Sequence, residues 1–321
     1  MTNTIPDKRP KYLTKLHQTV YYICRKKVQL LIYLVVYPFL WLISILPFRL
    51  LYLFSDFTYF LLYYVVGYRK RVVRENINKA LPHLSDKERL NIEKKSYKHL
   101  CDMFLEMIKT MSISKKEIER RFVFTNIETY KKLEKQDKSI ALLCAHYASY
   151  EWVISMNRYS AFESYAIYKK INNKYFDRLV KKIRGKFKAK LIHVKETIDV
   201  ITTNEQNGIR GLYGFASDQS PQLKKLTHWD YFMGIDVPVY TGAEYLSKKF
   251  DMNVIYLKVE KIKRGFYEAT LEVLSENVRE IPNYQLTRMF LDRVEQQIRK
   301  EPEFYLWTHR RWKHEGKKGT I

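Results

Sequence analysis

The sequence predicts an α/β protein in which N-terminal membrane-associated helices precede a mixed, largely parallel sheet flanked by helices. Residues 28–46 are apolar and uncharged, and as a helix these 19 residues would span roughly 28 Å, close to the hydrocarbon thickness of a bilayer. From residue 139 onward, short apolar runs of strand length alternate with helical patterns, which is typical of a parallel sheet with crossover helices. These two patterns together predict the fold class.

The N-terminal region contains two apolar stretches with different expected roles. We expect residues 28–46 to form a retained membrane helix, because a long basic segment precedes them and no small-residue cleavage site follows. Residues 50–68 include Asp56 and several tyrosines. Since an ionised Asp at mid-bilayer costs about 2.5–3.5 kcal/mol, this second stretch is expected to lie in the membrane interface or to pack against the globular part. Basic residues precede the first stretch and follow the second, which favours a cytoplasmic position for both flanks. A single span cannot satisfy that, whereas a shallow or re-entrant insertion could, so the topology stays open.

Three regions follow from this pattern. They are a basic N-terminus with membrane-anchoring segments at 1–68, a helical region packing on the core at 69–138 (helical over 69–125), and an α/β catalytic core at 139–321. After a first strand at 139–145, the core is expected to have strands at 164–168, 190–194, 209–216, 253–260 and 267–274. The last two are expected to form an antiparallel hairpin. Helices are expected at 175–187, 197–206, 241–250 and 284–300.

The charge balance limits the classes of partner. The chain has 58 Lys and Arg against 34 Asp and Glu, a net charge of +24, which favours an acidic partner: nucleic acid, an anionic membrane or an acidic carrier protein. Its three cysteines form no CxxC pair, so no metal site is expected and a reducing compartment is favoured. The sequence has no GxxxxGK[ST], GxGxxG, HExxH or GxSxG motif. Nucleotide hydrolysis, dinucleotide redox chemistry, zinc-dependent proteolysis and serine-hydrolase chemistry therefore have no local support.

The main candidate site is the segment 139–155, SIALLCAHYASYEWVIS. His146 follows the apolar strand directly, and Glu151 lies five positions later, where helical character resumes. On an ideal helix this spacing separates two side chains by roughly 140°, but a strand-to-helix turn would let Glu151 reach back to His146. A neutral imidazole held by a carboxylate is the arrangement of a general base for a hydroxyl proton. The alternative is structural, because a His with a Glu five residues later is common by chance.

Three later clusters could complete this site. One is the segment 168–170 with the amphipathic helix that follows it, where most cations are expected on the solvated surface and one Arg at the cleft. The second directly follows the strand 209–216, where turn chemistry alone would also explain an Asp. The third, in 302–314, has paired arginines among aromatics, which either bind a phosphate or anchor this segment at a membrane surface. The candidate substrate-binding residues are Tyr168, Lys170, Arg184, Asp218, Gln219, Arg310 and Arg311.

The block from His146 to Glu151 resembles the acyltransferase motif of the lipid A biosynthesis (late, secondary) acyltransferases, within the bacterial lysophospholipid acyltransferase superfamily. Further blocks similar to that family occur in the same order over most of the chain. They are Arg74-Glu75-Asn76-Ile77 with Leu81-Pro82-His83-Leu84, Tyr168…Asn172-Asn173…Arg184-Gly185, Asp218-Gln219, Phe232-Met233-Gly234 with Val237-Pro238…Thr241-Gly242-Ala243, and Tyr305-Leu306-Trp307-Thr308-His309-Arg310-Arg311-Trp312-Lys313. Each block is weak alone, and their shared order makes the resemblance specific.

The resemblance implies a glycerolipid acyltransferase-like fold and a reaction. It implies transfer of an acyl chain from acyl carrier protein to a hydroxyl of a lipid A precursor, at the cytoplasmic face of the bacterial inner membrane and without a metal or organic cofactor. The implied partners are acyl carrier protein, the lipid and the membrane surface, with no nucleic acid. This chain departs from the family at Ala148-Ser149-Tyr150 and at Tyr168-Lys169-Lys170, which bears on the acceptor and chain length more than on the reaction.

The mechanism expected from these residues is general-base catalysis. His146, oriented by Glu151, would remove the acceptor proton, and Arg184 would stabilise an oxyanion or a nearby phosphate. Asp218 and Gln219 would shape the cleft. A lysophospholipid, a glycerol phosphate or an amino-acid-linked lipid stays open as the acceptor. The remote alternative is a membrane-anchored nucleic-acid-binding protein, whose binding would depend steeply on salt and not on His146 or Glu151.

Overall fold

The protein is built around one seven-stranded sheet, seen here in a computed structural model that describes residues 11–222 and 228–318, with side chains from residue 26 onward. The strand order is β1-β9-β8-β2-β5-β3-β4, and neighbours run parallel except for the antiparallel pair β8 and β9. The strands are β1 (Phe122–Phe124), β2 (Ile140–Cys144), β3 (Glu163–Tyr168), β4 (Lys190–His193), β5 (Gly211–Ala216), β8 (Asn253–Lys263) and β9 (Phe266–Ser275). The predicted mixed, largely parallel sheet and the predicted hairpin are both confirmed.

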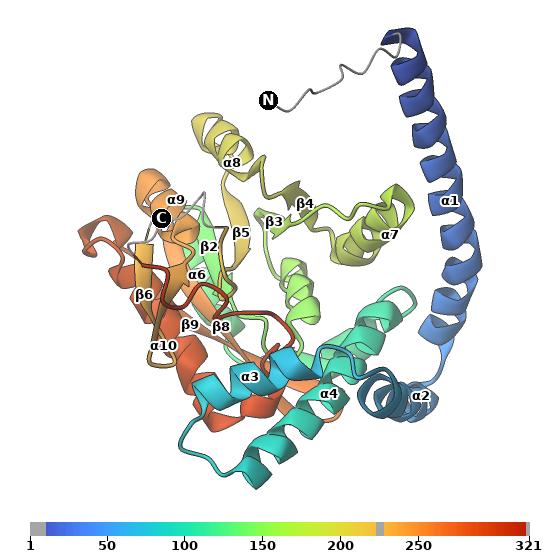
Figure 1. The fold of residues 1–321 in the computed structure, drawn as a ribbon. Coiled ribbons are helices and arrows are strands. Elements are labelled where there is room, and N and C mark those ends of the chain that lie inside the picture. Colours follow the sequence, from blue (N-terminus) through green and yellow to red (C-terminus); the bar gives the residue numbers. More distant parts are fainter. Residues whose placement is uncertain (1–10, 223–227, 319–321) are drawn as a thin grey trace, which may run out of the picture.

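The helices of the C-terminal half lie close to their predicted positions, and α8 (Thr197–Gln206) has the predicted bounds. The other helices of the globular part are α3 (Lys70–Ala80), α4 (Asp86–Lys109), α5 (Lys115–Arg121), α6 (Ile127–Glu134), α7 (Lys174–Arg184), α9 (Gly242–Phe250) and α10 (Gln285–Lys300). Short 3-10 helices include η2 (Tyr150–Arg158), η3 (Gly185–Phe187) and η6 (Pro302–Phe304). Figure 1 shows α3 and α4 crossing the base of the molecule below the sheet.

Two elements differ from the prediction. The region 69–125, predicted to be helical, ends in the strand β1, whose partner β9 lies about 145 positions later in the chain, so no local pattern indicates it. The hairpin of β6 (His228–Phe232) and β7 (Ile235–Val239) was not predicted either. Its two turn residues, Met233 and Gly234, both have positive φ (53° and 79°), as a two-residue type I′ turn requires.

The two apolar N-terminal stretches form separate helices. In α1 (Lys11–Ile45), residues 26–45 are long and apolar enough to cross a membrane, and the helix runs along one side of the molecule (Figure 1). The next segment, α2 (Phe48–Phe60) continued by a π-helical turn, packs on the globular part, as expected for 50–68. Asp56 pairs with Arg264 at 2.8 Å, and Ser55 donates a hydrogen bond to Asp102 at 2.7 Å. The charge of Asp56 is therefore neutralised by protein. The basic residues before position 11 lie outside the described residues.

Asn76 of α3 fastens the C-terminal segment onto the globular part. Its buried side-chain amide donates to the backbone carbonyls of Trp307 (2.7 Å) and His309 (2.6 Å). The same segment reaches the predicted site, because the Leu306 amide donates to the carbonyl of His146 at 3.1 Å. The block around Asn76 thus positions a distant segment beside His146.

We expect Asn76→Ala to lower the free energy of unfolding by about 1–3 kcal/mol, because it leaves two carbonyls without their donor. Hydrogen exchange should become faster at the amides of residues 305–309. Asn78→Ala is the matched control, since Asn78 is exposed on the same helix. Equal unfolding midpoints and equal exchange for the two variants would contradict this assignment.

Candidate active site

The site lies where two neighbouring parallel strands end. β2 and β5 pair in register up to Cys144 and Ala216, so the residues that follow them meet at the same edge of the sheet. His146 follows β2, and Asp218 follows β5. One Asp218 carboxylate oxygen accepts hydrogen bonds from the His146 backbone amide at 3.1 Å and from its Nδ1 at 2.7 Å. Asp218 is fully buried, whereas the His146 side chain is partly exposed.

The hydrogen bond to Asp218 determines the chemistry of the imidazole. Because a carboxylate accepts from Nδ1–H, the neutral ring has its lone pair on Nε2, the nitrogen that would take a proton. Burial alone lowers the pKa of His146, but the negative charge of Asp218, its hydrogen bond and the charge of Glu151 outweigh burial and raise that pKa above its usual value. For Asp218, burial raises the pKa, and the His146 charge and hydrogen bonds overcome this and lower it. Both directions favour the ion pair.

The prediction that Glu151 orients His146 is wrong. Glu151, in the first turn of η2, accepts two hydrogen bonds from Arg184 of α7, at 3.0 and 2.7 Å. A guanidinium matches both carboxylate oxygens at once, which makes Arg184 the stronger partner. The turn before η2 has Ala148 at a φ of 48°, which changes the chain direction between His146 and Glu151. Asp218, which we had expected to shape the cleft, holds the imidazole instead.

A cavity of about 500 Å³ opens beside His146 over one face of the sheet. Its floor consists of alternating residues of β2 and β5, which point to the same face, together with residues 164–168 of the adjacent strand β3. Several of them are small, including Cys144, Ala166, Gly214 and Ala216, so the space above them stays empty. The cavity is lined mainly by apolar side chains.

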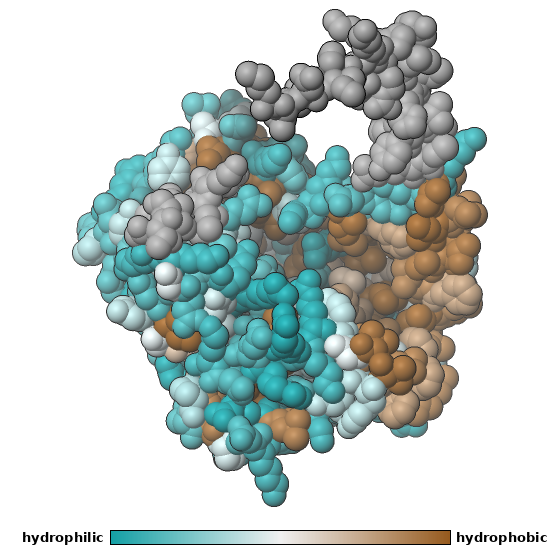
Figure 2. Space-filling view, in the orientation of Figure 1, coloured by the Kyte–Doolittle hydropathy of each residue, from teal (hydrophilic) through white to brown (hydrophobic). Residues whose placement is uncertain are grey.

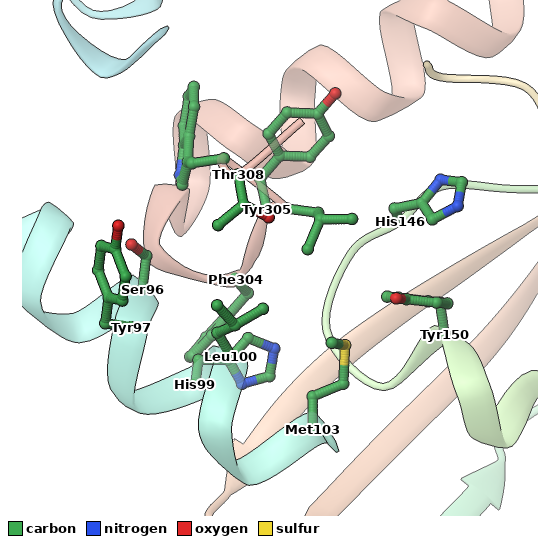
Figure 3. A pocket seen from close by; sticks show the side chains of 12 residues that line it. Ser96, Tyr97, His99, Leu100, Met103, His146, Tyr150, Phe304, Tyr305 and Thr308 are labelled. Atoms are coloured by element: carbon green, nitrogen blue, oxygen red, sulfur yellow. The ribbon is translucent and has the colours of Figure 1, made fainter. Parts of the chain in front are cut away.

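A second, smaller pocket lies on the other side of His146, against α4 and the C-terminal segment (Figure 3). His146 and Tyr150 line both spaces. Their rings meet edge to face with centroids 4.9 Å apart. In Figure 3, Tyr150 reaches toward this pocket with its hydroxyl foremost, facing Met103 and Leu100 of α4. The two rings therefore form the junction between the cavity and the smaller pocket. Tyr150 was not among the predicted site residues.

Of the other predicted substrate-binding residues, two line the large cavity and three line neither space. Tyr168 and Arg184 line the large cavity. Lys170 is exposed and its neighbour Lys169 lines the cavity instead, while Gln219 and Arg310 line neither space.

The prediction that Arg311 binds a phosphate is wrong in this structure. Arg311 is fully buried, its guanidinium lies over the Phe232 ring at 4.7 Å, and Nη1 donates to the Pro238 carbonyl at 3.3 Å.

Among the described residues, no group of three or more His, Cys, Asp or Glu side chains is placed to hold a metal ion.

A comparison with protein families identifies the chain. The model of the bacterial lipid A biosynthesis acyltransferases matches residues 23–314. The chain belongs to this family. The match includes His146, Asp218 and both cavities, and it confirms the resemblance found in the sequence. The lipid A acyltransferase family implies an acyltransferase that acts on a lipid acceptor, and the apolar α1 fits its association with membranes. No curated protein matched the chain in a separate search.

The pairing with Asp218 predicts the titration of His146. Asp218→Asn removes the negative charge that favours the imidazolium, so the pKa of His146 should fall by about one unit or more. The pKa can be followed by NMR of ¹³C-labelled histidine in detergent. Glu151→Gln is the comparison, and it should lower this pKa less, because Glu151 acts on the ring only through its charge. A larger fall in Glu151→Gln than in Asp218→Asn would contradict the assignment.

Proposed function

We propose that this protein transfers a fatty acyl chain from the thioester of acyl carrier protein to a hydroxyl of a lipid A precursor, with His146 as the general base. The observation that supports this most is the buried Asp218 carboxylate on Nδ1 of His146, beside an apolar cavity of about 500 Å³. With its lone pair on Nε2, the His146 imidazole can remove a proton from a hydroxyl, and an apolar cavity of this size can hold a hydrocarbon chain. Family membership supports the lipid acceptor.

The proposed reaction has two proton transfers at one atom. The acceptor oxygen attacks the thioester carbonyl carbon while Nε2 of His146 takes the hydroxyl proton, and Asp218 stabilises the resulting imidazolium. The C–S bond then breaks, the ester forms, and the imidazolium returns its proton to the leaving thiolate. These steps call for no metal or organic cofactor. Arg184, held by Glu151, lines the cavity and would contact a lipid phosphate with its remaining donors.

The surface supports a location at an anionic membrane. Figure 2 shows hydrophobic side chains gathered along α1 and α2 at one edge of the molecule, next to a surface that is otherwise mostly hydrophilic. Leu31, Phe39, Leu53 and Phe57 are among the exposed apolar residues there. The net charge of +24 would attract anionic lipid and an acidic carrier protein, with each near-surface cation contributing about 1 kcal/mol at a membrane. We place the catalytic part at the cytoplasmic face of the bacterial inner membrane.

His146→Ala should reduce acyl transfer by about 10²–10⁴-fold, the usual contribution of a general base. The assay uses the full chain in detergent, acyl carrier protein with a defined acyl group and an under-acylated lipid A precursor, and product is detected by mass spectrometry. His83→Ala is the control, since His83 is exposed on the surface.

Transfer by His146→Ala at the wild-type rate would remove His146 from the mechanism. Transfer by the wild type to a lysophospholipid, a glycerol phosphate or an amino-acid-linked lipid, in place of the lipid A precursor, would overturn the proposed acceptor.

A further inference from the structure

Helix α1 turns one face toward the globular part and the other away from it. Between residues 26 and 45, the partly or fully covered positions recur every three or four residues, which places them on one face of the helix. They are Lys26, Gln29, Tyr33, Val36, Tyr37, Leu40, Ile43 and Ser44. The opposite face is apolar and exposed, with Leu31, Leu34, Val35, Phe39 and Leu42 all more than half exposed. The helix therefore has a protein side and a side suited to hydrocarbon.

The protein side of α1 touches two separate helices. Near its middle, the Tyr33 ring contacts Tyr175 and Phe176 of α7, with centroids 5.6 and 5.5 Å apart. At its C-terminal end, Lys109 of α4 donates to the carbonyl of Ser44 at 2.7 Å. Tyr33 and Ser44 are 11 positions apart, or roughly 16 Å along the helix. Thus α1 connects α7 with α4.

The large cavity reaches both α4 and α7. Its lining includes Phe104 and Met107 of α4, Val180 of α7 and Ile171 just before α7. Phe104 and Ile171 line the cavity and yet are 47% and 37% exposed, which marks them as rim residues. The rim thus lies on α4 and on the segment that leads into α7, next to the two helices that α1 connects.

We propose that the opening between α4 and α7, bounded on the outside by α1, is a lateral portal through which the hydrocarbon chain of an anionic bilayer lipid enters the cavity. A chain that crossed water to reach the cavity would expose its methylene groups to solvent, which is unfavourable, whereas a portal beside the apolar face of α1 keeps them among apolar groups. Exposed cations on and before α7 would contact the lipid phosphate, among them Lys169, Lys174, Arg178 and Lys182. The proposal rests on the proposed function only for the identity of the lipid.

The test is photolabelling, which needs no catalysis. The full chain is reconstituted in vesicles of phosphatidylethanolamine and phosphatidylglycerol that contain phosphatidylglycerol with a diazirine near the end of one chain, and labelled peptides are mapped by mass spectrometry. We expect label at Met107 and Val180 in addition to the outer faces of α1 and α2. Phe104→Arg and Ile171→Arg should each reduce the label at Met107 and Val180 by about tenfold, because a guanidinium at the rim is unfavourable beside hydrocarbon.

Val123→Arg is the matched control, since Val123 is an apolar residue 43% exposed on β1 and lines neither the cavity nor the smaller pocket. It should leave the labelling unchanged. Label confined to the outer faces of α1 and α2, or label at Met107 and Val180 unaffected by both rim variants, would overturn the portal. That result would overturn the portal and leave the proposed function standing. Conversely, a wild-type protein that showed no acyl transfer would overturn the proposed function, but the label at Met107 and Val180 would still support the portal.

A second observation concerns Tyr150. Its hydroxyl, at the junction of the cavity and the smaller pocket, has no hydrogen-bond partner among the described residues. The guanidinium that we had expected to stabilise the oxyanion is directed at Glu151 by the bidentate pair. Burial, together with the charge of Glu151, raises the pKa of Tyr150, so its hydroxyl stays protonated and remains a donor.

We infer that the Tyr150 hydroxyl donates a hydrogen bond to the thioester carbonyl oxygen as that oxygen becomes negatively charged. This inference rests on the proposed function. Tyr150→Phe keeps the ring against His146 and should lower kcat by about 10²–10³-fold, as expected for one lost oxyanion donor, with the KM of the acyl donor nearly unchanged. Tyr159→Phe, a change outside both spaces, should be neutral. Equal kcat for Tyr150→Phe and the wild type, in an assay where His146→Ala shows its expected loss of transfer, would overturn this role while leaving the proposed function standing.

Discussion

The hydrogen bond between Asp218 and His146 is the constraint on which the site depends, and it exists because β2 and β5 are parallel neighbours in one register. Cys144 pairs with Ala216, and each strand is followed two residues later by one member of the pair. A shift of this register by one residue would turn every side chain of the shifted strand to the other face of the sheet. The alternating residues that form the cavity floor would then change with it. Catalytic geometry and substrate space are thus both consequences of how these two strands pair.

The buried carboxylate also links the site to stability. A fully buried Asp without a partner is costly, so the fold must supply one. His146 supplies it with two donors, its ring and its backbone amide. The C-terminal segment then covers the pair, since Leu306 bonds to the carbonyl of His146 and the Ser220 amide bonds to His309 at 3.1 Å. Asn76 holds that segment from α3. Residues from four distant parts of the chain therefore keep one imidazole in place.

Much of the fold was predictable because its signals are local. Apart from the β6–β7 hairpin, the strands and helices from β3 to α10 fall near their predicted bounds. Asp56 favoured a position in the membrane interface or against the globular part for the second apolar stretch, and the structure has it paired with Arg264 of the globular part. The partner of His146 was not predictable from spacing. Glu151 is near in sequence, whereas Asp218 is 72 positions away and meets His146 only through a strand order that differs from chain order. Each residue was recognised at the end of its own strand, but no local pattern states which strands are neighbours.

Burial was the other property that sequence could not supply. Arg310 and Arg311 are adjacent and chemically identical, yet Arg311 is fully enclosed above the Phe232 ring while Arg310 is exposed. Their difference arises from the packing of the terminal segment against the β6–β7 hairpin, an element that the sequence did not reveal. The burial of Arg311 was therefore missed because the hairpin that covers it was not predicted.

The charges around the cavity explain why proton uptake by His146 is favourable there. Glu151 and Arg184 form a pair with no net charge. With His146 neutral, Asp218 leaves one negative charge beside an apolar space, where low dielectric strengthens electrostatic interactions. When His146 takes a proton, its pair with Asp218 also becomes neutral overall, which is the physical basis of its raised pKa. The His146–Asp218 and Glu151–Arg184 pairs are thus each neutral overall in the state that follows proton transfer. Such an arrangement stabilises the imidazolium at the moment when an attacking hydroxyl has given up its proton.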